Sequence, residues 1–210
     1  GVCNTVFGAL HDIGHTALSH IVDRAKGRQD QNYHDLTRDE FVKKCKNIMR
    51  ILKKNGIDVD FVLNPENFPL IKCEAPYVSA DKLDYCLRFG LDFGIIDIEK
   101  ARYFLDNLFI ANNRWVFKNL ESAREFAEFV LLINDNYFCG WQSAIMMETA
   151  GAWLEHALDK GYINDQELYD EDKNVIKKIN LNLLKDEHLG KLFYRMENPK
   201  FAEVYGTERL

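Results

Sequence analysis

One short segment of the chain gathers the residue types that best hold a divalent metal ion. His11, Asp12 and His15 lie close together, and His20 and Asp23 follow soon after them. Imidazole nitrogens and carboxylate oxygens together suit Mn, Fe, Zn or Mg. A metal held in this way does polar chemistry on an oxygen-rich substrate, and a phosphate ester is the class that we expect.

A helix, a turn and a second helix over residues 11–23 are the elements expected to position these groups. On a helix, His11 and His15 lie one turn apart on one face, and Asp12 lies about 100° away around the axis. Asp12 is then near enough to bind the same metal from a helix end. The alternative is a helix surface that is rich in His and Asp and binds nothing.

A second motif, Ser-Ala-Asp-Lys-Leu-Asp-Tyr, lies far downstream at residues 79–85. A helix is expected from about Ser79 to Phe89. Asp81 and Tyr85 are four positions apart on it and share a face. Because a metal needs ligands from more than one helix, Asp81 is expected to converge with the first cluster.

Further charged residues belong to the same helix. Asp84 lies close to the shared face, and Arg88 continues the stripe. Lys82 and Arg88 fit the binding of a phosphate, because both side chains are cationic. The alternative for both is an ordinary solvated helix flank.

The two motifs together resemble the HD superfamily of metal-dependent phosphohydrolases, which is named for the adjacent His-Asp pair. The form Asp-Lys-x-Asp-Tyr is similar to that of its deoxynucleoside triphosphate triphosphohydrolase branch. The resemblance covers residues 1–90, and beyond them only the helical character is shared. It implies an HD-type helical bundle that hydrolyses a phosphate ester, with a nucleotide as the expected substrate and a divalent metal as cofactor.

The resemblance implies a set of metal ligands. His11 and Asp12 correspond to two of them and Asp81 to a third. The remaining ligand in the superfamily is a histidine about one helix upstream, and residues 1–10 contain none. We therefore expect an upstream segment that supplies it; the alternative is a defective site.

The resemblance also implies catalytic roles. His15 resembles the histidine beside the scissile phosphate, and His34 resembles the second histidine that works with it. A histidine with a pKa near neutrality can protonate a leaving oxygen or stabilise developing charge. Asp23 and His20 resemble members of a proton relay that also orients the metal ligands.

Substrate contacts and supporting groups follow from the same resemblance. Lys82 and Tyr85 correspond to residues that touch phosphate and sugar, with Arg88 beside them. Asp84 is expected to orient its neighbours. Tyr137 matches a tyrosine that frames the nucleotide.

The chain also departs from the triphosphohydrolase branch. Phe89 follows Arg88 where that branch often carries an aspartate. Phe129 and Ile133 stand where it carries an arginine and a histidine. If these two line the far wall of the site, a mono- or diphosphate or a loosely held triphosphate is favoured. The alternative function is a catalytically degenerate HD module that binds a nucleotide or a protein partner.

Two neighbouring classes of enzyme are disfavoured by single positions. HD enzymes that open cyclic dinucleotides carry lysine where this chain has His15. Zinc peptidases with the HExxH motif use glutamate as the base, whereas this chain has Asp12 and Gly14 interrupts the helix.

Composition sets the broad class of protein. The net charge of −6 argues against a nucleic-acid partner, because phosphate backbones attract basic surfaces. The five cysteines form no CxxC pair, and free, buried thiols fit a reducing cytoplasm. No apolar run reaches the roughly 18 residues of a membrane span. We expect a cytoplasmic protein without a membrane partner. Composition leaves open whether the chain forms a homo-oligomer.

Hydrophobic periodicity predicts an all-α fold in a single domain, residues 1–210, with the motifs in 1–90 and supporting helices in 91–210. A capping box is expected at Thr37–Glu40, before a helix that ends near Gly56. A short hairpin is expected at Phe109–Phe117. The other expected helices are one that starts near Asp97 with Leu105 facing inward, then Glu121–Phe138, Trp141–Lys160, Asp165–Tyr169, Glu171–Ile179 and Asp186–Met196.

Overall fold

The computed structural model describes residues 1–28, 32–73 and 77–198. These residues are mainly helical, and the strands among them form one two-stranded antiparallel sheet. The all-α class and the short hairpin are therefore confirmed. None of the described helices combines the length and the apolar character that crossing a membrane requires.

The described residues form two compact units, and each unit combines two separate stretches of the chain. Unit 1 contains Gly1–Leu10 and Asn47–Phe138. Unit 2 contains His11–Lys46 and the described part of Cys139–Leu210. The single domain over residues 1–210 stays a prediction.

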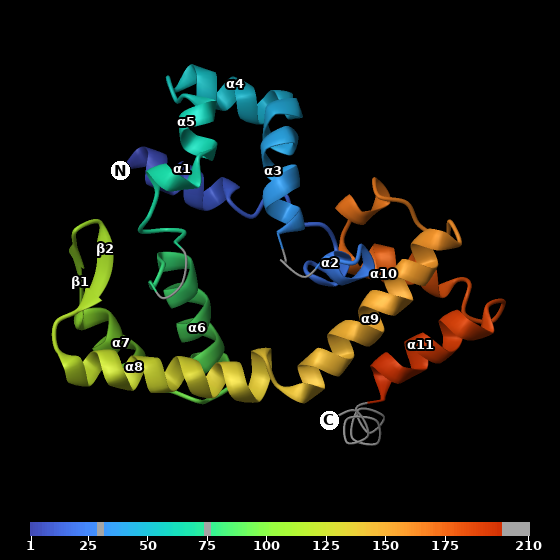
Figure 1. Ribbon diagram of the computed structural model, residues 1–210. Helices are drawn as coiled ribbons and strands as arrows, with labels where there is room; N and C mark the ends of the chain where they lie inside the picture. The colour runs from blue at the N-terminus through green and yellow to red at the C-terminus, as the bar shows by residue number, and fades with distance from the viewer. Residues whose placement is uncertain (29–31, 74–76, 199–210) are drawn as a thin grey trace. The chain divides into compact units, whose positions relative to one another are not determined.

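Unit 1 is built from helices and the hairpin (Figure 1). Buried aromatic and aliphatic side chains form its core, including Phe104, Phe126 and Ile133. Its elements are α1 (Val2–Leu10), α4 (Lys46–Lys54), α5 (Val59–Leu63), a 3₁₀ turn (Pro65–Asn67), α6 (Ala80–Asp92), α7 (Ile98–Asp106), β1 (Leu108–Ala111), β2 (Arg114–Phe117), α8 (Leu120–Ile133) and a π-helical turn (Asn134–Phe138).

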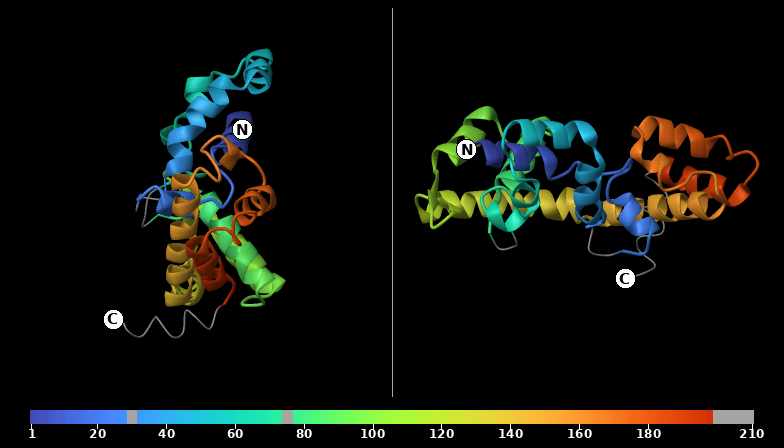
Figure 2. Two further views of the ribbon diagram at one scale, coloured as in Figure 1. Left: turned by 90° about the vertical axis from the view of Figure 1, so that its right-hand side faces the viewer. Right: turned by 90° about the horizontal axis from the view of Figure 1, so that it is seen from above.

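Unit 2 packs around the long helix α9, which α2 and α11 both contact. Figure 1 and the right-hand view of Figure 2 show α11 running beside α9. Trp153 and Leu154 of α9 are fully buried in its core. Its elements are α2 (Ile21–Ala25), α3 (Tyr33–Lys44), α9 (Trp141–Asp159), a 3₁₀ turn (Glu167–Tyr169), α10 (Asp172–Asn180) and α11 (Glu187–Glu197).

Several helices begin at a side chain that accepts a backbone N–H from the first turn. Ser79 Oγ accepts from Lys82 N at the start of α6, and Asp97 caps α7 in the same way. Such a cap satisfies a donor that has no partner within the helix. The hairpin turns at Asn112 and Asn113, whose positive φ angles of 49° and 59° fit a type I′ turn.

Some expected elements are wrong. Thr37 is not a cap, because α3 already begins at Tyr33 and the Thr37 hydroxyl contacts backbone carbonyl oxygens instead. The expected helix after it is divided at Cys45, whose ψ of 100° lies outside the helical region. Residues 11–14 form a turn rather than a helix.

Two smaller expectations also fail. Leu105 on α7 is 52% exposed, so it does not face the core. The expected helix Asp165–Tyr169 is only a 3₁₀ turn, Glu167–Tyr169. All five cysteines are free as expected, yet only Cys86 is buried, while Cys139 is exposed. Burial raises the pKa of the Cys86 thiol.

Candidate functional site

The turn of residues 11–14 brings the first two histidines to one aspartate. The His15 N–H donates to the Asp12 carbonyl oxygen at 3.0 Å and closes the turn. Asp12 Oδ2 lies 3.2 Å from His11 Nε2, and Asp12 Oδ1 lies 3.9 Å from His15 Nε2. A turn, rather than one helix face, therefore forms the cluster.

A third histidine joins the cluster from α3. His34 is buried, and its Nε2 lies 4.0 Å from Asp12 Oδ1. Its ring stacks on that of His15, with 4.0 Å between the ring centroids and 12° between the planes. The expectation that the two histidines act together is thus matched by their contact, whereas their catalytic roles stay predictions.

Gly14 allows α3 to approach the turn. A Cβ atom at Gly14 would lie 2.2 Å from the carbonyl oxygen of His34, which is a severe overlap with backbone. Thr37 Oγ1 lies 3.1 Å from the Gly14 carbonyl oxygen and joins the same two segments. Glycine is therefore required at this position for a close backbone approach.

His20 reaches the cluster from a turn of unusual conformation. Leu18 and Ser19 both have positive φ angles, 63° and 42°, which non-glycine residues rarely adopt. The Leu18 N–H donates to Asp172 Oδ1 at 3.0 Å, so α10 helps to hold the turn. The His20 ring centroid lies 5.3 Å from that of His15. Strained backbone of this kind concentrates at functional sites.

Asp23 connects His20 to α3. Its side chain is buried and accepts the Tyr33 N–H at 2.9 Å, and its other oxygen lies 3.3 Å from His20 Nδ1. A carboxylate at the first N–H of a helix is also favoured by the helix dipole. Asp23 therefore positions both the His20 ring and the helix that carries His34.

The cluster fits a divalent cation. One ligand atom from each of Asp12, His15 and His34 lies within 4.8 Å of the others. The 3.9 and 4.0 Å gaps from Asp12 Oδ1 are too long for hydrogen bonds. Two ligands that are each about 2.1 Å from one ion lie roughly 3–4 Å apart. The donor set and its spacing both suit a metal.

The charge state of His15 also suits this use. Burial lowers the pKa of His15 below its ordinary value of 6.5, while the Asp12 carboxylate opposes that shift and His20 adds to it. The lowered pKa favours the neutral imidazole, which is the form that binds metals and donates a single hydrogen bond.

Sequence reasoning missed Arg38 and misread Thr37. The Arg38 side chain is buried on α3, with Nη1 3.5 Å from Asp35 Oδ1 and Nη2 2.9 Å from Asp39 Oδ1. Asp35 Oδ2 in turn lies 3.7 Å from His34 Nε2. Arg38 follows His34 by one helical turn, and this spacing could have indicated that the two side chains share a face of the helix.

The second motif lies on α6, in unit 1. Asp81, Asp84 and Arg88 are exposed, and Asp84 pairs with Arg88 one turn later. Asp81 belongs to unit 1, whereas His11 and Asp12 belong to unit 2. Its convergence with them stays a prediction, as do the substrate contacts of Lys82.

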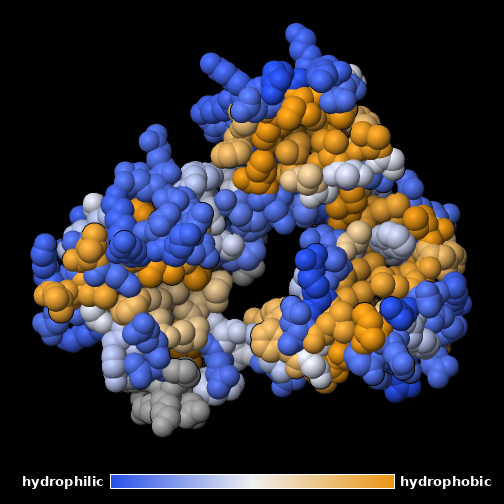
Figure 3. Space-filling model, turned by 180° about the vertical axis from the view of Figure 1, so that it is seen from behind, coloured by the Kyte–Doolittle hydropathy of each residue, from blue (hydrophilic) through white to orange (hydrophobic). Residues whose placement is uncertain are grey.

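Aromatic residues surround the two tyrosines that we expected to touch substrate. Tyr85 packs on Phe138, and Tyr137 packs on Phe89 and Phe93. The π-helical turn that follows α8 carries both Tyr137 and Phe138. Figure 3 shows apolar surface on the part of unit 1 built from α6 and α8. The spacing of positions 85, 89 and 93 could have indicated this stripe.

Phe129 and Ile133 do not line the wall of a site. Both are buried in the core of unit 1, where Phe129 packs on Phe104 and Ile133 is fully enclosed. The expectation that they limit the number of phosphates is therefore wrong, because neither side chain is available to a ligand.

Two curated proteins are similar to the chain. The uncharacterized protein YdhJ of Bacillus subtilis (strain 168) is 29% identical over 172 residues, which are 81% of this chain and 53% of that protein. Metal-dependent phosphohydrolase cns2 of Cordyceps militaris is 36% identical over 104 residues, which are 49% of this chain and 30% of that protein. The chain spans about half of the first protein and under a third of the second. No protein-family model and no solved structure matches the chain.

Proposed function

We propose that the chain carries the catalytic part of an HD-type, metal-dependent phosphohydrolase. The observation that carries this proposal is Asp12, whose carboxylate faces nitrogen atoms of His11, His15 and His34 at 3.2–4.0 Å. The similarity to a protein named metal-dependent phosphohydrolase supports the same reaction class. Mn, Fe, Zn and Mg are the candidate ions.

His11, Asp12 and Asp81 are the proposed metal ligands. His15 and His34 then face the phosphate rather than the metal. The geometry also supports a second ligand set, in which Asp12, His15 and His34 hold the ion themselves. When bound, the metal supplies Lewis acidity at the phosphate and lowers the pKa of a coordinated water.

The residues of this chain would act on the phosphate oxygens. His15 and His34 would donate hydrogen bonds to oxygens on which charge develops, and a ring in its imidazolium form would protonate the leaving oxygen. Asp23 orients the His20 ring, and a proton would pass between Nδ1 of His20 and the Asp23 carboxylate. Each of these groups is within unit 2 and already in contact with its neighbour.

A nucleotide is the proposed substrate, and a deoxynucleoside triphosphate is one candidate within that class. Lys82 and Arg88 would bind phosphate, because cationic side chains pair with its oxygens. The rings of Tyr85 and Tyr137 would stack on a base, since aromatic side chains accept any base face. The proposal of a nucleotide substrate rests on the resemblance of the motif on α6 to that of the triphosphohydrolase branch.

The test is metal content and phosphate release in the same set of variants. Protein reconstituted with Mn or Fe should release phosphate from one or more nucleotides. His11→Ala and Asp81→Asn should lose metal. His15→Ala and His34→Ala should keep the metal and lose about 10²- to 10⁴-fold in turnover.

A matched control is His188→Ala, which removes a histidine of unit 2 that lies beside His156. It should leave both metal content and turnover unchanged. Loss of metal in His15→Ala and His34→Ala, with retention in Asp81→Asn, would replace the first ligand set by the second. Metal or nucleotide binding without phosphate release under any condition would favour the non-hydrolytic binding module.

A further inference from the structure

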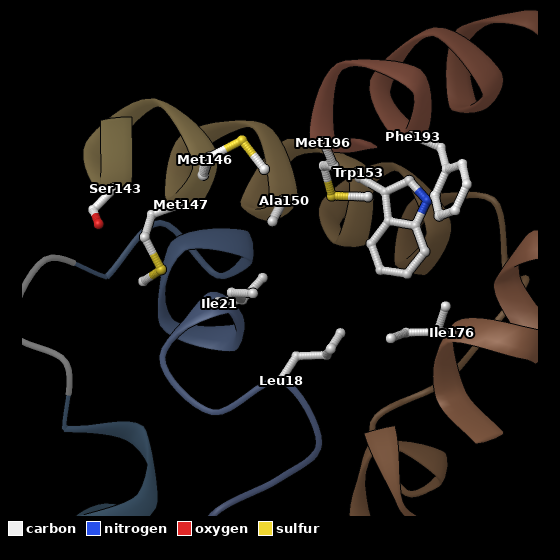
Figure 4. Close-up of a pocket in the computed structure, with 10 residues that line it drawn as sticks. All are labelled: Leu18, Ile21, Ser143, Met146, Met147, Ala150, Trp153, Ile176, Phe193 and Met196. Atoms are coloured by element: carbon white, nitrogen blue, oxygen red, sulfur yellow. The ribbon is translucent and has the colours of Figure 1, made fainter. Parts of the chain in front are cut away.

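Unit 2 contains a pocket of about 400 Å³ among the turn before α2, α2 itself, α9, α10 and α11 (Figure 4). Its 10 lining residues carry no charge, and all except Ser143 are apolar. A volume of this size lies within the range of small-molecule sites. The lining excludes an anion or a cation, because neither would find a partner of opposite charge.

One buried polar group in this lining has no hydrogen-bond partner among the described residues. Trp153 is only 2% exposed, and its Nε1 makes no hydrogen bond within residues 1–28, 32–73 and 77–198. Figure 4 shows the nitrogen on the edge of the indole ring next to Phe193, which also lines the pocket. A buried N–H without an acceptor costs free energy, and most are paired in folded proteins. An atom that accepts this hydrogen would relieve the cost.

The pocket wall can also adapt to its occupant. Met146, Met147 and Met196 supply three of the lining side chains. Methionine is unbranched and polarizable, so it adjusts to ligands of different shape. Three such residues around one pocket suit a ligand better than they suit a rigidly specified core.

We propose that this pocket binds a neutral, mainly apolar small molecule that carries one hydrogen-bond acceptor. The apolar body fills the space between the methionines and Ile21. The acceptor receives the Trp153 N–H. An aromatic ketone has this chemistry, and its matching hydrocarbon lacks only the acceptor.

The position of the pocket connects it to the histidine cluster. Leu18 and Ile21 line it, and they flank Ser19 and His20 in the chain. A bound molecule would therefore contact both ends of the turn that presents His20. The binding proposal stands independently of the proposed hydrolase activity.

Methionine methyl groups provide a direct test with an internal control. The chain has four methionines, and three line the pocket, while Met49 lies in α4 of unit 1. Protein labelled with [¹³C-methyl]methionine would be titrated with propiophenone and with propylbenzene. We expect saturable shifts of the three lining signals, an unchanged Met49 signal, and about 3- to 10-fold tighter binding of the ketone.

Two variants complete the test. Trp153→Phe keeps an aromatic ring and removes the N–H, so the ketone and the hydrocarbon should bind equally. Ala150→Leu should fill the pocket and abolish saturable shifts while the circular dichroism spectrum stays that of the parent. Absent shifts in the parent protein, or equal shifts of Met49, would overturn the proposal. So would a ketone preference that survives Trp153→Phe.

Discussion

Two of the places in unit 2 where histidine faces aspartate differ in the distances between the two side chains. In the first, Asp12 Oδ1 lies 3.9 and 4.0 Å from nitrogens of His15 and His34. In the second, His156 Nε2 lies 2.8 Å from Asp186 Oδ2. The first pair of gaps is too long for hydrogen bonds, whereas the second distance is a normal one.

The partners of the two carboxylates explain the difference. Asp186 also accepts the Tyr162 hydroxyl at 3.0 Å and, as the N-cap of α11, the Leu189 N–H at 3.0 Å. Its two oxygens therefore serve three donors in a structural contact. Asp12 is 52% exposed and faces imidazole nitrogens across gaps that one cation can bridge. The same residue types thus build a helix cap in one place and a candidate metal site in the other.

The largest expected effect separates these two aspartates directly. Asp12→Asn removes the charge that balances a cation, so metal content should fall and turnover should drop by about 10³-fold or more. Asp186→Asn should retain metal and turnover, while its Tm falls. Metal analysis, phosphate release and thermal unfolding would be measured on both variants. Equal loss of metal in both would remove the distinction drawn between the two places.

A smaller effect is expected where the first cluster depends on close backbone approach. Gly14→Ala should push the turn away from the His34 carbonyl oxygen, because the new Cβ would meet it at 2.2 Å. A displacement of about 1 Å at a catalytic group can cost about 10²-fold in turnover. The matched control is Gly8→Ala in α1, where a Cβ meets nothing within 4 Å. Parent-like turnover in Gly14→Ala would show that the His15–His34 contact is dispensable.

Local features of the fold could be predicted from the sequence better than tertiary contacts. The helix starts near Ser79 and Asp97 and the hairpin at Phe109–Phe117 were predicted because each depends on neighbours a few positions away. The gathering of His11, Asp12 and His15 was expected, yet through a helix rather than a turn. Thr37 was misread because its hydroxyl serves a contact with Gly14, 23 positions earlier. Such tertiary contacts leave no periodic pattern in one sequence.

An exposed ion pair on α6 extends the comparison to a third aspartate. Asp84 pairs with Arg88, and both side chains are mostly exposed. Arg88→Ala should therefore change the free energy of unfolding by less than about 0.5 kcal/mol. If Arg88 binds phosphate, kcat/KM should still fall by about 10-fold, mainly through KM. Lys191→Ala, which breaks an exposed pair with Glu187 on α11, is the control. Unchanged kinetics in Arg88→Ala would leave it an ordinary helix flank.

The smallest expected effect is the pH dependence of the stability that Asp186 contributes at the start of α11. The Leu189 N–H, followed by His156 and Tyr162, lowers the pKa of Asp186 below its ordinary value of 3.8. Between the pKa of Asp186 in the folded protein and its ordinary value of 3.8, the unfolded chain binds more protons than the folded one. The stability that ionised Asp186 contributes is therefore complete above pH 3.8 and is lost as the pH falls below that value. The difference in Tm between the parent and Asp186→Asn should narrow as the pH falls from about 5 towards 3. A difference that stays constant down to pH 3 would mean that the cap does not depend on the charge of Asp186.

Asp170→Asn is the control, because among the described residues Asp170 accepts from the Asn174 side chain and the Glu171 N–H rather than from a histidine. The difference in Tm between the parent and Asp170→Asn should be smaller and should narrow over the same pH range, since the pKa of Asp170 is also lowered. The amount by which the Tm difference of Asp186→Asn exceeds it measures the stability that His156 and Tyr162 add.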